Sequence, residues 1–167
     1  MAVRIRSAGR SDLPALGLGD PSLVEYLRHW LFLAAIGDAA VLVAEEDDAP
    51  GTTGPFGRVV VDLARGQVLA VEVAEGHRRS GVGRRLMDAA RDAATERGHR
   101  RLTLLVEVTN SQARAFYTSL GWQDDGAEVS SALTAPDGSV AQPPVACRRL
   151  VLDLSRPPRP PVPPRRG

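Results

Sequence analysis

Two glycines one residue apart, Gly81 and Gly83, stand between a predicted strand and a predicted helix in the segment VEVAEGHRRSGVGRRLMDAA (71–90). The apolar alternation of residues 67–75 predicts the strand, and the helical spacing within residues 84–98 predicts the helix. Glycine adopts backbone conformations that other residues avoid, and it lets a ligand approach the backbone closely. The turn therefore has two interpretations: a tight connection with a solvated basic face, or a cradle for phosphate.

The phosphate interpretation follows from the start of the helix. The first amides of a helix have no partners within it, and the helix dipole makes that end positive. Successive amides turned inward at such a turn form a nest for an anion. Four arginines flank the glycines: Arg78, Arg79, Arg84 and Arg85. These features predict a pyrophosphate site, but the segment has neither the G-x-G-x-x-G nor the G-K-[ST] fingerprint, so another phosphate carrier is required.

The rest of the chain alternates between strand and helix patterns, which predicts a mixed α/β sheet in one domain. Ser11 or Asp12 is expected to cap a helix start, Gly37 to stop the first long helix, and residues 126–144 to form a loop. Strands are expected at 2–8, 39–47, 56–63, 67–75, 100–108 and 146–154, and helices at 20–37, 84–98 and 111–121.

Composition bounds the class of protein. A chain of 167 residues with 43% hydrophobic and 25% charged residues can bury one globular core. The formal net charge of +1 argues against a nucleic-acid-binding domain. The closing segment is rich in proline and arginine, contains no acidic residue after position 155, and has almost nothing to bury. We therefore expect a domain at 1–154 and an extended or disordered tail at 155–167.

Cysteine and histidine usage gives further expectations. The single cysteine, Cys147, permits no internal disulfide and favours a reducing compartment. The start of the sequence lacks the apolar segment of a signal peptide, and no apolar run is long enough to span a bilayer, so we expect a cytoplasmic location without a membrane partner. His29, His77 and His99 form no ligand spacing with Cys147, so no metal site is predicted, and Cys147 is expected to be a core residue.

Two motifs that occur in order carry a resemblance to a known family. The first is [QR]-x-x-G-x-[GA], here Arg78 to Gly83, and the second is N-x-x-A-x-x-x-Y-x-x-x-G-[FW], here Asn110 to Trp122. Together with the opening VRIRSAGRSDLPAL, they resemble the GNAT superfamily of N-acetyltransferases over residues 3–154. The resemblance implies the α/β GNAT (acyl-CoA N-acyltransferase) fold: a mixed, mostly antiparallel sheet with a central, splayed parallel strand pair flanked by helices.

The resemblance also implies a binding site for acetyl-CoA as cosubstrate. In the family, amides of the glycine turn bind the coenzyme A pyrophosphate, the preceding strand lends backbone groups to the pantetheine arm, and the start of the later helix contacts the same arm. The residues thereby assigned to the coenzyme are Val71, Val73, Arg78, Arg79, Ser80, Gly81, Val82, Gly83, Arg84, Asn110, Ala113 and Tyr117.

Acyl transfer from a thioester to an amine needs a neutral amine, a stabilised oxyanion and a protonated leaving thiolate. Backbone amides of the splayed strand at Val73 can serve the oxyanion. The resemblance gives Tyr117 the role of protonating the thiolate. Without the motif, Tyr117 would be interpreted as an aromatic residue packing the last helix.

The general base is open between two glutamates. Glu72 lies on the face of its strand opposite Val71 and Val73, and Glu107 lies near the end of the next strand. A carboxylate among apolar residues is costly unless it is solvated, paired or used in chemistry. The alternative for either glutamate is a salt bridge to an arginine such as Arg114 or Arg101.

The sequence thus predicts an N-acetyltransferase that moves the acetyl group of acetyl-CoA to a primary amine by direct transfer in a ternary complex. The acceptor is open between a small molecule and a protein or peptide amino group, and a homodimer is open as well. The alternative function is a non-catalytic, regulatory acyl-CoA-binding module. Tyr117 and the intact glycine turn favour the enzyme.

Overall fold

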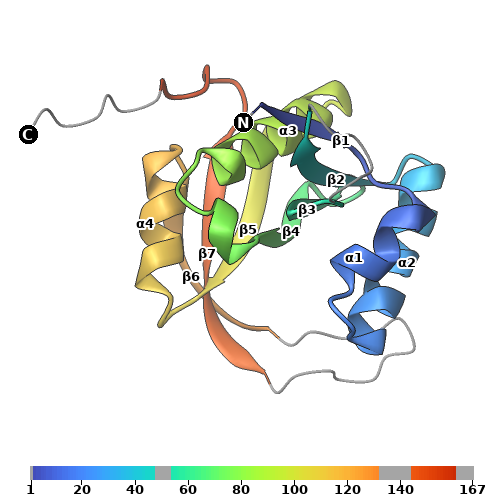
Figure 1. Cartoon of the computed structure of the whole chain (residues 1–167). Coiled ribbons are helices and arrows are strands. Elements are labelled where there is room, and N and C mark those ends of the chain that lie inside the picture. The colour runs from blue at the N-terminus through green and yellow to red at the C-terminus, as the bar shows by residue number, and fades with distance from the viewer. Residues whose placement is uncertain (1, 48–53, 132–143, 161–167) are drawn as a thin grey trace, which may run out of the picture.

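The computed structural model describes residues 2–47, 54–131 and 144–160, which form one seven-stranded sheet with helices on both faces (Figure 1). The spatial order is β1-β2-β3-β4-β5-β7-β6, and every neighbouring pair is antiparallel except β4 and β5. The strands are β1 (Val3–Ser7), β2 (Ala39–Glu46), β3 (Gly57–Asp62), β4 (Gln67–Val73), β5 (Arg101–Glu107), β6 (Gln123–Ser131) and β7 (Val145–Asp153).

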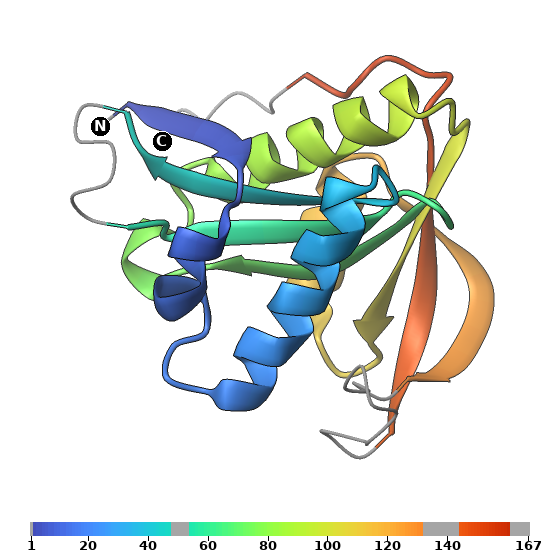
Figure 2. The ribbon, with the colours of Figure 1, turned by 90° about the vertical axis from the view of Figure 1, so that its right-hand side faces the viewer.

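The helices divide the core into two hydrophobic clusters, one on each face of the sheet. In Figure 2, α1 and α2 lie in front of the strands, and α3 runs along the other side. β3 contacts both clusters, because Val59 and Val61 face α3 and α4 whereas Val60 faces α2. The helices are α1 (Leu13–Leu16), α2 (Pro21–Ala35), α3 (Val82–Glu96) and α4 (Ser111–Ser119), with 3-10 turns η1 (Arg10–Asp12) and η2 (Glu75–His77).

The parallel strands β4 and β5 pair only at their beginnings. Their register pairs Gln67 with Thr103 and Val68 with Leu104, and no further pairs follow. A bulge in β4 explains the separation: the register with β3 shifts between Arg58 and Val60, and Ala70 has a φ of 45°. A bulge bends its strand and increases the local twist. The expected splayed parallel pair at the centre of the sheet is therefore confirmed.

One expected loop contains a strand. Residues 126–144 were expected to connect the last two elements as a loop, but residues 123–131 form β6, and residues 132–143 lie outside the described ranges. β6 is a mostly exposed edge strand with the polar sequence QDDGAEVSS, so it lacks the apolar alternation that marks a half-buried strand. Backbone pairing with β7 forms this strand, and two partly exposed ion pairs accompany it, Asp124 with Arg148 and Asp125 with Arg149.

The starts of the first helices depend on two aspartates. Asp20 caps α2 by accepting hydrogen bonds from the amides of Ser22 and Leu23. Asp12 lies at the N-cap position of α1, one of the two positions expected, but its side chain makes no cap hydrogen bond there. It accepts from the amide of Gly9 at 2.7 Å and closes the η1 turn. The long helix ends at Ala35, just before Gly37, close to its expected stop.

Buried charges join β1, β2 and the η1 turn. Arg6 contacts both Asp12 oxygens at 2.8 Å and one Glu45 oxygen at 2.7 Å, and Arg4 also donates to Glu45. Both carboxylates are buried, with exposed side-chain fractions of 7% for Asp12 and 3% for Glu45. Hydrogen bonding to Arg6 holds the pKa of each carboxyl below its ordinary value.

The C-terminal segment follows β7 without a helix or strand as far as residue 160. It runs beside α3 at the top of Figure 1. Arg91 and Arg84 of α3 donate hydrogen bonds to the carbonyls of Arg156 and Arg159. Residues 161–167 of the predicted tail lie outside the described ranges. None of the helices within those ranges is long and apolar enough to cross a membrane.

Replacing Arg6 by methionine should destabilise the protein by about 3 kcal/mol at pH 7, because buried carboxylates lose a charged partner. The ion pairs lower the carboxyl pKa values in the folded state, so their contribution is present above about pH 4 and is lost as the pH falls through the folded pKa values. Urea unfolding should therefore show that the difference in free energy of unfolding between wild type and Arg6→Met is smaller at pH 3 than at pH 7.

The matched control is Arg28→Met, which breaks an ion pair to Glu25 that is about half exposed on both sides. Its effect should stay within about 0.5 kcal/mol at either pH. An Arg6 variant as stable as wild type at pH 7, or equally destabilised at both pH values, would contradict the assigned role of the network.

Candidate active site

The glycine turn presents a row of open backbone amides. Arg79 and Gly81 have φ values of 61° and 85°, and Gly81 precedes α3 without a capping side chain. Within the described ranges, the amides of residues 79–84 donate to no acceptor. Such amides at the positive end of a helix form an anion site. The predicted phosphate cradle therefore has the geometry it needs.

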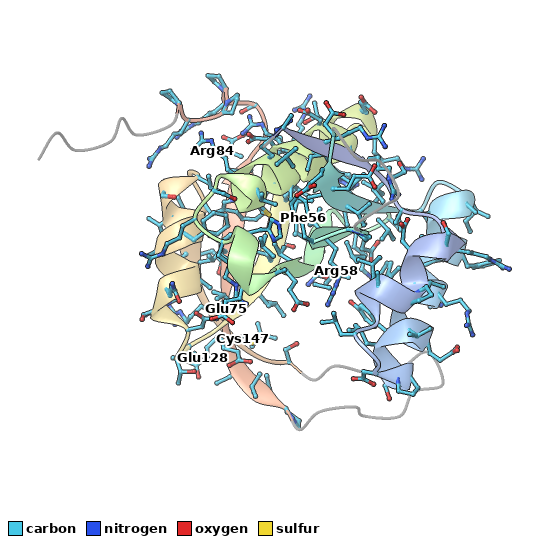
Figure 3. All side chains as sticks on the ribbon, in the orientation of Figure 1. Phe56, Arg58, Glu75, Arg84, Glu128 and Cys147 are labelled. Atoms are coloured by element: carbon cyan, nitrogen blue, oxygen red, sulfur yellow. The ribbon has the colours of Figure 1, made fainter. Side chains whose placement is uncertain are left out.

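Contacts of its own side chains hold the turn in place. Arg78 Nε donates to the Val73 carbonyl at 2.9 Å, and Ser80 Oγ donates to the His77 carbonyl at 2.5 Å. The His77 ring stacks on Phe56 with centroids 4.0 Å apart and planes within 6° of parallel. Phe56 lies near the centre of the molecule in Figure 3. The conformation of the turn therefore rests on contacts within the protein, an arrangement that would reduce the ordering cost of binding a ligand.

Glycine is favoured at positions 81 and 83 for different physical reasons. A Cβ on Gly81 would meet no atom within 4 Å, so its positive φ is what favours glycine there. A Cβ on Gly83 would lie 3.1 Å from Cζ of Phe116. Gly83 therefore lets α3 approach α4 closely, a packing role that the sequence analysis missed because it considered only the approach of a ligand.

The separation of β4 and β5 leaves a cavity of about 430 Å³. Three residues of the second motif, namely Asn110, Ala113 and Tyr117, line it from the α4 side. On the other side, the lining includes Tyr26 of α2 and two neighbouring strand residues, Glu107 and Cys147. Leu104 and Val106 of β5 point into the α3–α4 cluster, so alternation turns Glu107 to the opposite face. The cavity therefore connects the two faces of the sheet.

Tyr117 and Asn110 are held in position by α4. The Tyr117 ring makes edge contacts with Trp122 at a centroid distance of 6.2 Å, and burial raises the pKa of its phenol above the usual value. Asn110 Oδ1 accepts from the Ala113 amide at 3.0 Å and caps the helix. Its side-chain NH₂ group remains available as a donor to a ligand. Both residues thus combine a structural contact with a free polar group.

The two candidate bases have different surroundings. Glu107 lines the cavity, is exposed, and makes no ion pair within the described residues. Glu72 does not line the cavity; it pairs with the buried Arg58 at 2.5 Å beside a separate hollow of about 70 Å³. Arg58 also donates to the Leu16 carbonyl at 3.2 Å and lies near the molecular centre (Figure 3). The salt-bridge alternative for Glu72 is therefore present, with Arg58 as partner.

The structure also separates the other candidate residues into those that line the cavity and those that do not. Val71 lines the cavity, whereas Val73 does not, and its carbonyl is already bonded to Arg78. Cys147 is buried, and both burial and the charge of Glu107 raise the pKa of its thiol. No histidine lines the cavity, so the partner that a nucleophilic Cys147 would need is missing from the described lining.

Comparison with known proteins agrees with this geometry. The sequence profile described as the Acetyltransferase (GNAT) family matches residues 13–122. The chain belongs to this family. Membership confirms the resemblance and the GNAT fold class, and it confirms acetyl-CoA, which the family uses, as the cosubstrate. No protein of curated function matches the chain.

Solved GNAT structures share the fold over nearly the whole chain. The acetyltransferase yncA of Salmonella typhimurium, solved with its cofactor acetyl-CoA, is 20% identical with a TM-score of 0.66, covering 96% of this chain and 98% of its own. The ribosomal-protein-alanine N-acetyltransferase of Brucella melitensis has 23% identity and a TM-score of 0.66, covering 90% and 99%. Nourseothricin acetyltransferase has 22% identity and a TM-score of 0.63, covering 92% and 99%.

Sequence reasoning missed two residues at the site. Tyr26 has the helical spacing of a core residue, and that spacing cannot show that the ring reaches the cavity. Phe116 stands beside the motif residue Tyr117 but follows no pattern of its own. Only the approach of α3 to α4 reveals its contact with Gly83.

Replacing Gly83 by valine should lower the melting temperature without any ligand, because the branched side chain meets the Phe116 ring. Overpacking of this kind costs about 1–3 kcal/mol. Thermal unfolding should show this loss. In a protein that already carries Phe116→Ala, adding Gly83→Val should lower the melting temperature by less than it does in wild type. A Gly83→Val protein with the wild-type melting temperature would refute the packing role.

Proposed function

We propose that this GNAT protein is an N-acetyltransferase that moves the acetyl group of acetyl-CoA to a primary amine by direct transfer in a ternary complex. The observation that carries the proposal is the cavity through the sheet, with Tyr117 on one face and Glu107 on the other. Donor and acceptor can then approach one reaction point from opposite sides. Proximity and alignment of this kind supply much of the rate enhancement in two-substrate reactions.

The coenzyme side of the cavity fits a long, phosphate-bearing thioester. The open amides of residues 79–84 suit the pyrophosphate, and a path from there to the cavity passes the open edges of β4 and β5. Val71 of β4 and the NH₂ group of Asn110 offer polar backbone and side-chain partners to an amide-containing arm. When bound, the coenzyme supplies an acetyl group activated as a thioester.

The chain's own residues supply the proton transfers. The amine nitrogen attacks the carbonyl carbon as the new C–N bond forms and the C–S bond breaks. Tyr117 Oη donates a proton to the departing sulfur, and its raised pKa keeps that proton in place at neutral pH. Glu107, directly or through water, accepts the proton that the amine must lose. Amides along the open edge of β4 stabilise the oxyanion, with Val71 better placed than Val73.

The acceptor enters from the face of Tyr26 and Glu107. The related structures include one enzyme acting on ribosomal-protein alanine and one acting on nourseothricin. Both a peptide amino group and a small-molecule amine therefore remain acceptor classes for this chain. We assign the groups that carry out the chemistry to residues 1–154 and a cytoplasmic location to the protein.

A thiol-release assay with acetyl-CoA tests the proposal across a panel of small amines, aminoglycosides and peptides with free amino termini. We expect at least one amine to raise thiol release above hydrolysis. Acetyl-CoA should also raise the melting temperature, by an amount equivalent to about 2.7 kcal/mol at a hundredfold excess over Kd. A thermal shift without turnover on any amine would favour the regulatory acyl-CoA-binding module.

Tyr117→Phe should fold and bind acetyl-CoA like wild type, because the ring and its contact with Trp122 remain. Loss of the phenolic proton donor should lower kcat by about 10²-fold, at the low end for a positioned acid because coenzyme A thiol is a fair leaving group. Steady-state kinetics should show kcat and kcat/KM falling together. An unchanged kcat, with chemistry rate-limiting, would reduce Tyr117 to a packing residue.

Glu107→Gln should lower kcat/KM for the amine by about 10²-fold near neutral pH, and the deficit should shrink at higher pH as free amine becomes abundant. Glu72→Gln is the matched comparison. It should retain most of the rate but lower the melting temperature, because Arg58 loses its carboxylate partner. pH–rate profiles and thermal unfolding of both variants distinguish the roles, and the reverse pattern would make Glu72 the base.

A further inference from the structure

Residues 155–160 form a strap along the outside of α3. Arg91 anchors it near the start by donating to the carbonyl of Arg156, and Arg84 anchors it near the end by donating to the carbonyl of Arg159. The two anchoring arginines are seven residues apart, about two helical turns, and so lie on one side of the helix. The strap therefore runs back toward the beginning of α3, where the open amides lie.

The end of the strap fits closely against the body of the protein. Pro158 and Arg159 border a residual hollow of only about 10 Å³, together with Leu120, Trp122 and Leu152. A Cβ on Gly121 would lie 3.9 Å from both Cδ and Nε of Arg159, so the stem of this arginine covers the end of α4. In Figure 3, Arg84 lies directly beneath the strap. The strap thus places the Arg159 side chain where α3 begins and α4 ends.

The arginines at this end of α3 have few acidic partners among the described residues. Within the described ranges, no ion pair involves Arg79, Arg85 or Arg159, and Arg84 has only Asp88, at 4.0 Å. These side chains add their charge to the positive end of the helix. A concentration of unpaired positive charge around open amides attracts an anion with several charges.

Arg84 belongs to both parts of this surface. Its backbone amide is one of the open amides of the turn, whereas its side chain reaches the strap. After donating from Nη2 to the Arg159 carbonyl, it retains other N–H donors for an anion. A second anion held by Arg84 and Arg159 would therefore lie within one arginine side chain of the pyrophosphate cradle.

We propose that the strap completes the coenzyme site, with Arg84 and Arg159 binding the 3′-phosphate of coenzyme A. This inference rests on the proposed binding of the coenzyme at residues 79–84. Coenzyme A carries one phosphate besides its pyrophosphate, and a single ribose ring joins the two. That separation matches an arrangement in which one residue, Arg84, contributes its amide to the first anion and its side chain to the second.

The test is calorimetric titration with coenzyme A and with dephospho-coenzyme A, which lacks the 3′-phosphate. Wild type should bind coenzyme A about fivefold more tightly, the upper size for exposed charge pairs. A chain ending at Leu154 keeps only Arg84 of the two arginines and should lose most of this preference. A chain ending at Pro160 should keep the wild-type preference, because it retains the whole strap.

Point variants distinguish an effect of the strap from a general effect of removing one positive charge. Arg159→Gln removes the cation at the site, and Arg91→Gln removes the anchor at the start of the strap together with a charge that borders the hollow shared with Arg84 and Arg159. Both variants should reduce the preference for coenzyme A. Arg97→Gln is the matched control, because it removes the same charge at the C-terminal end of α3. In wild type, Arg97 pairs with Asp38 and not with the strap. Arg97→Gln should keep the preference.

The proposal is overturned if the chain ending at Leu154 prefers coenzyme A as strongly as wild type does, or if Arg97→Gln loses as much preference as Arg159→Gln. It is also overturned if wild type binds both ligands equally, an outcome that leaves the proposed acetyltransferase function standing. Failure of wild type to bind either ligand would remove the proposed function itself. If the shortened chain does not fold, Arg159→Gln and Arg91→Gln decide.

Discussion

The bulge in β4 is the constraint on which the rest of the site depends. Parallel strands that kept pairing along their full length would leave no opening in the middle of a seven-stranded sheet. The residue at the bulge, Ala70, has a positive φ of 45°, a conformation that is uncommon outside glycine and costs energy. The core on both faces of β3 and β4 holds this conformation in place. The resulting cavity lets α4 and α2 face one space from opposite sides.

The bulge also decides which acidic side chain faces the cavity. Leu69 and Ala70 both pack on the α2 side, so the alternation of β4 restarts after them, and Glu72 is directed to the buried Arg58. On β5, which has no such interruption, plain alternation directs Glu107 to the cavity lining. If a carboxylate that neutralises a buried guanidinium accepted a proton or moved toward a substrate, the guanidinium would lose its charged partner, which costs stability. An exposed carboxylate at the cavity has no such structural duty.

The sequence predicted what depends on local patterns, namely the strand–glycine–helix unit, the long helices and most strands. It did not reveal β6, because a polar, exposed edge strand that pairs with β7 through its backbone has no apolar period to detect. It left the general base open between Glu72 and Glu107, because one inserted residue in a ladder is invisible in the order of side chains. The contact of Gly83 with Phe116 was equally hidden, since it joins two helices across space.

Solvation then gives the two faces of the cavity different proton chemistry. Tyr117 lies among Phe116 and Trp122, where desolvation disfavours the phenolate and raises its pKa, so the group is kept as a donor. Glu107 lies at the exposed end of β5, where water can carry a proton from an incoming amine to its oxygens. An acid that holds its proton and an acceptor in contact with water are the two groups that amide formation from a thioester requires. Their separation by the thickness of the sheet follows from the opening between β4 and β5, so one irregularity of the backbone produces both the passage and the division of roles.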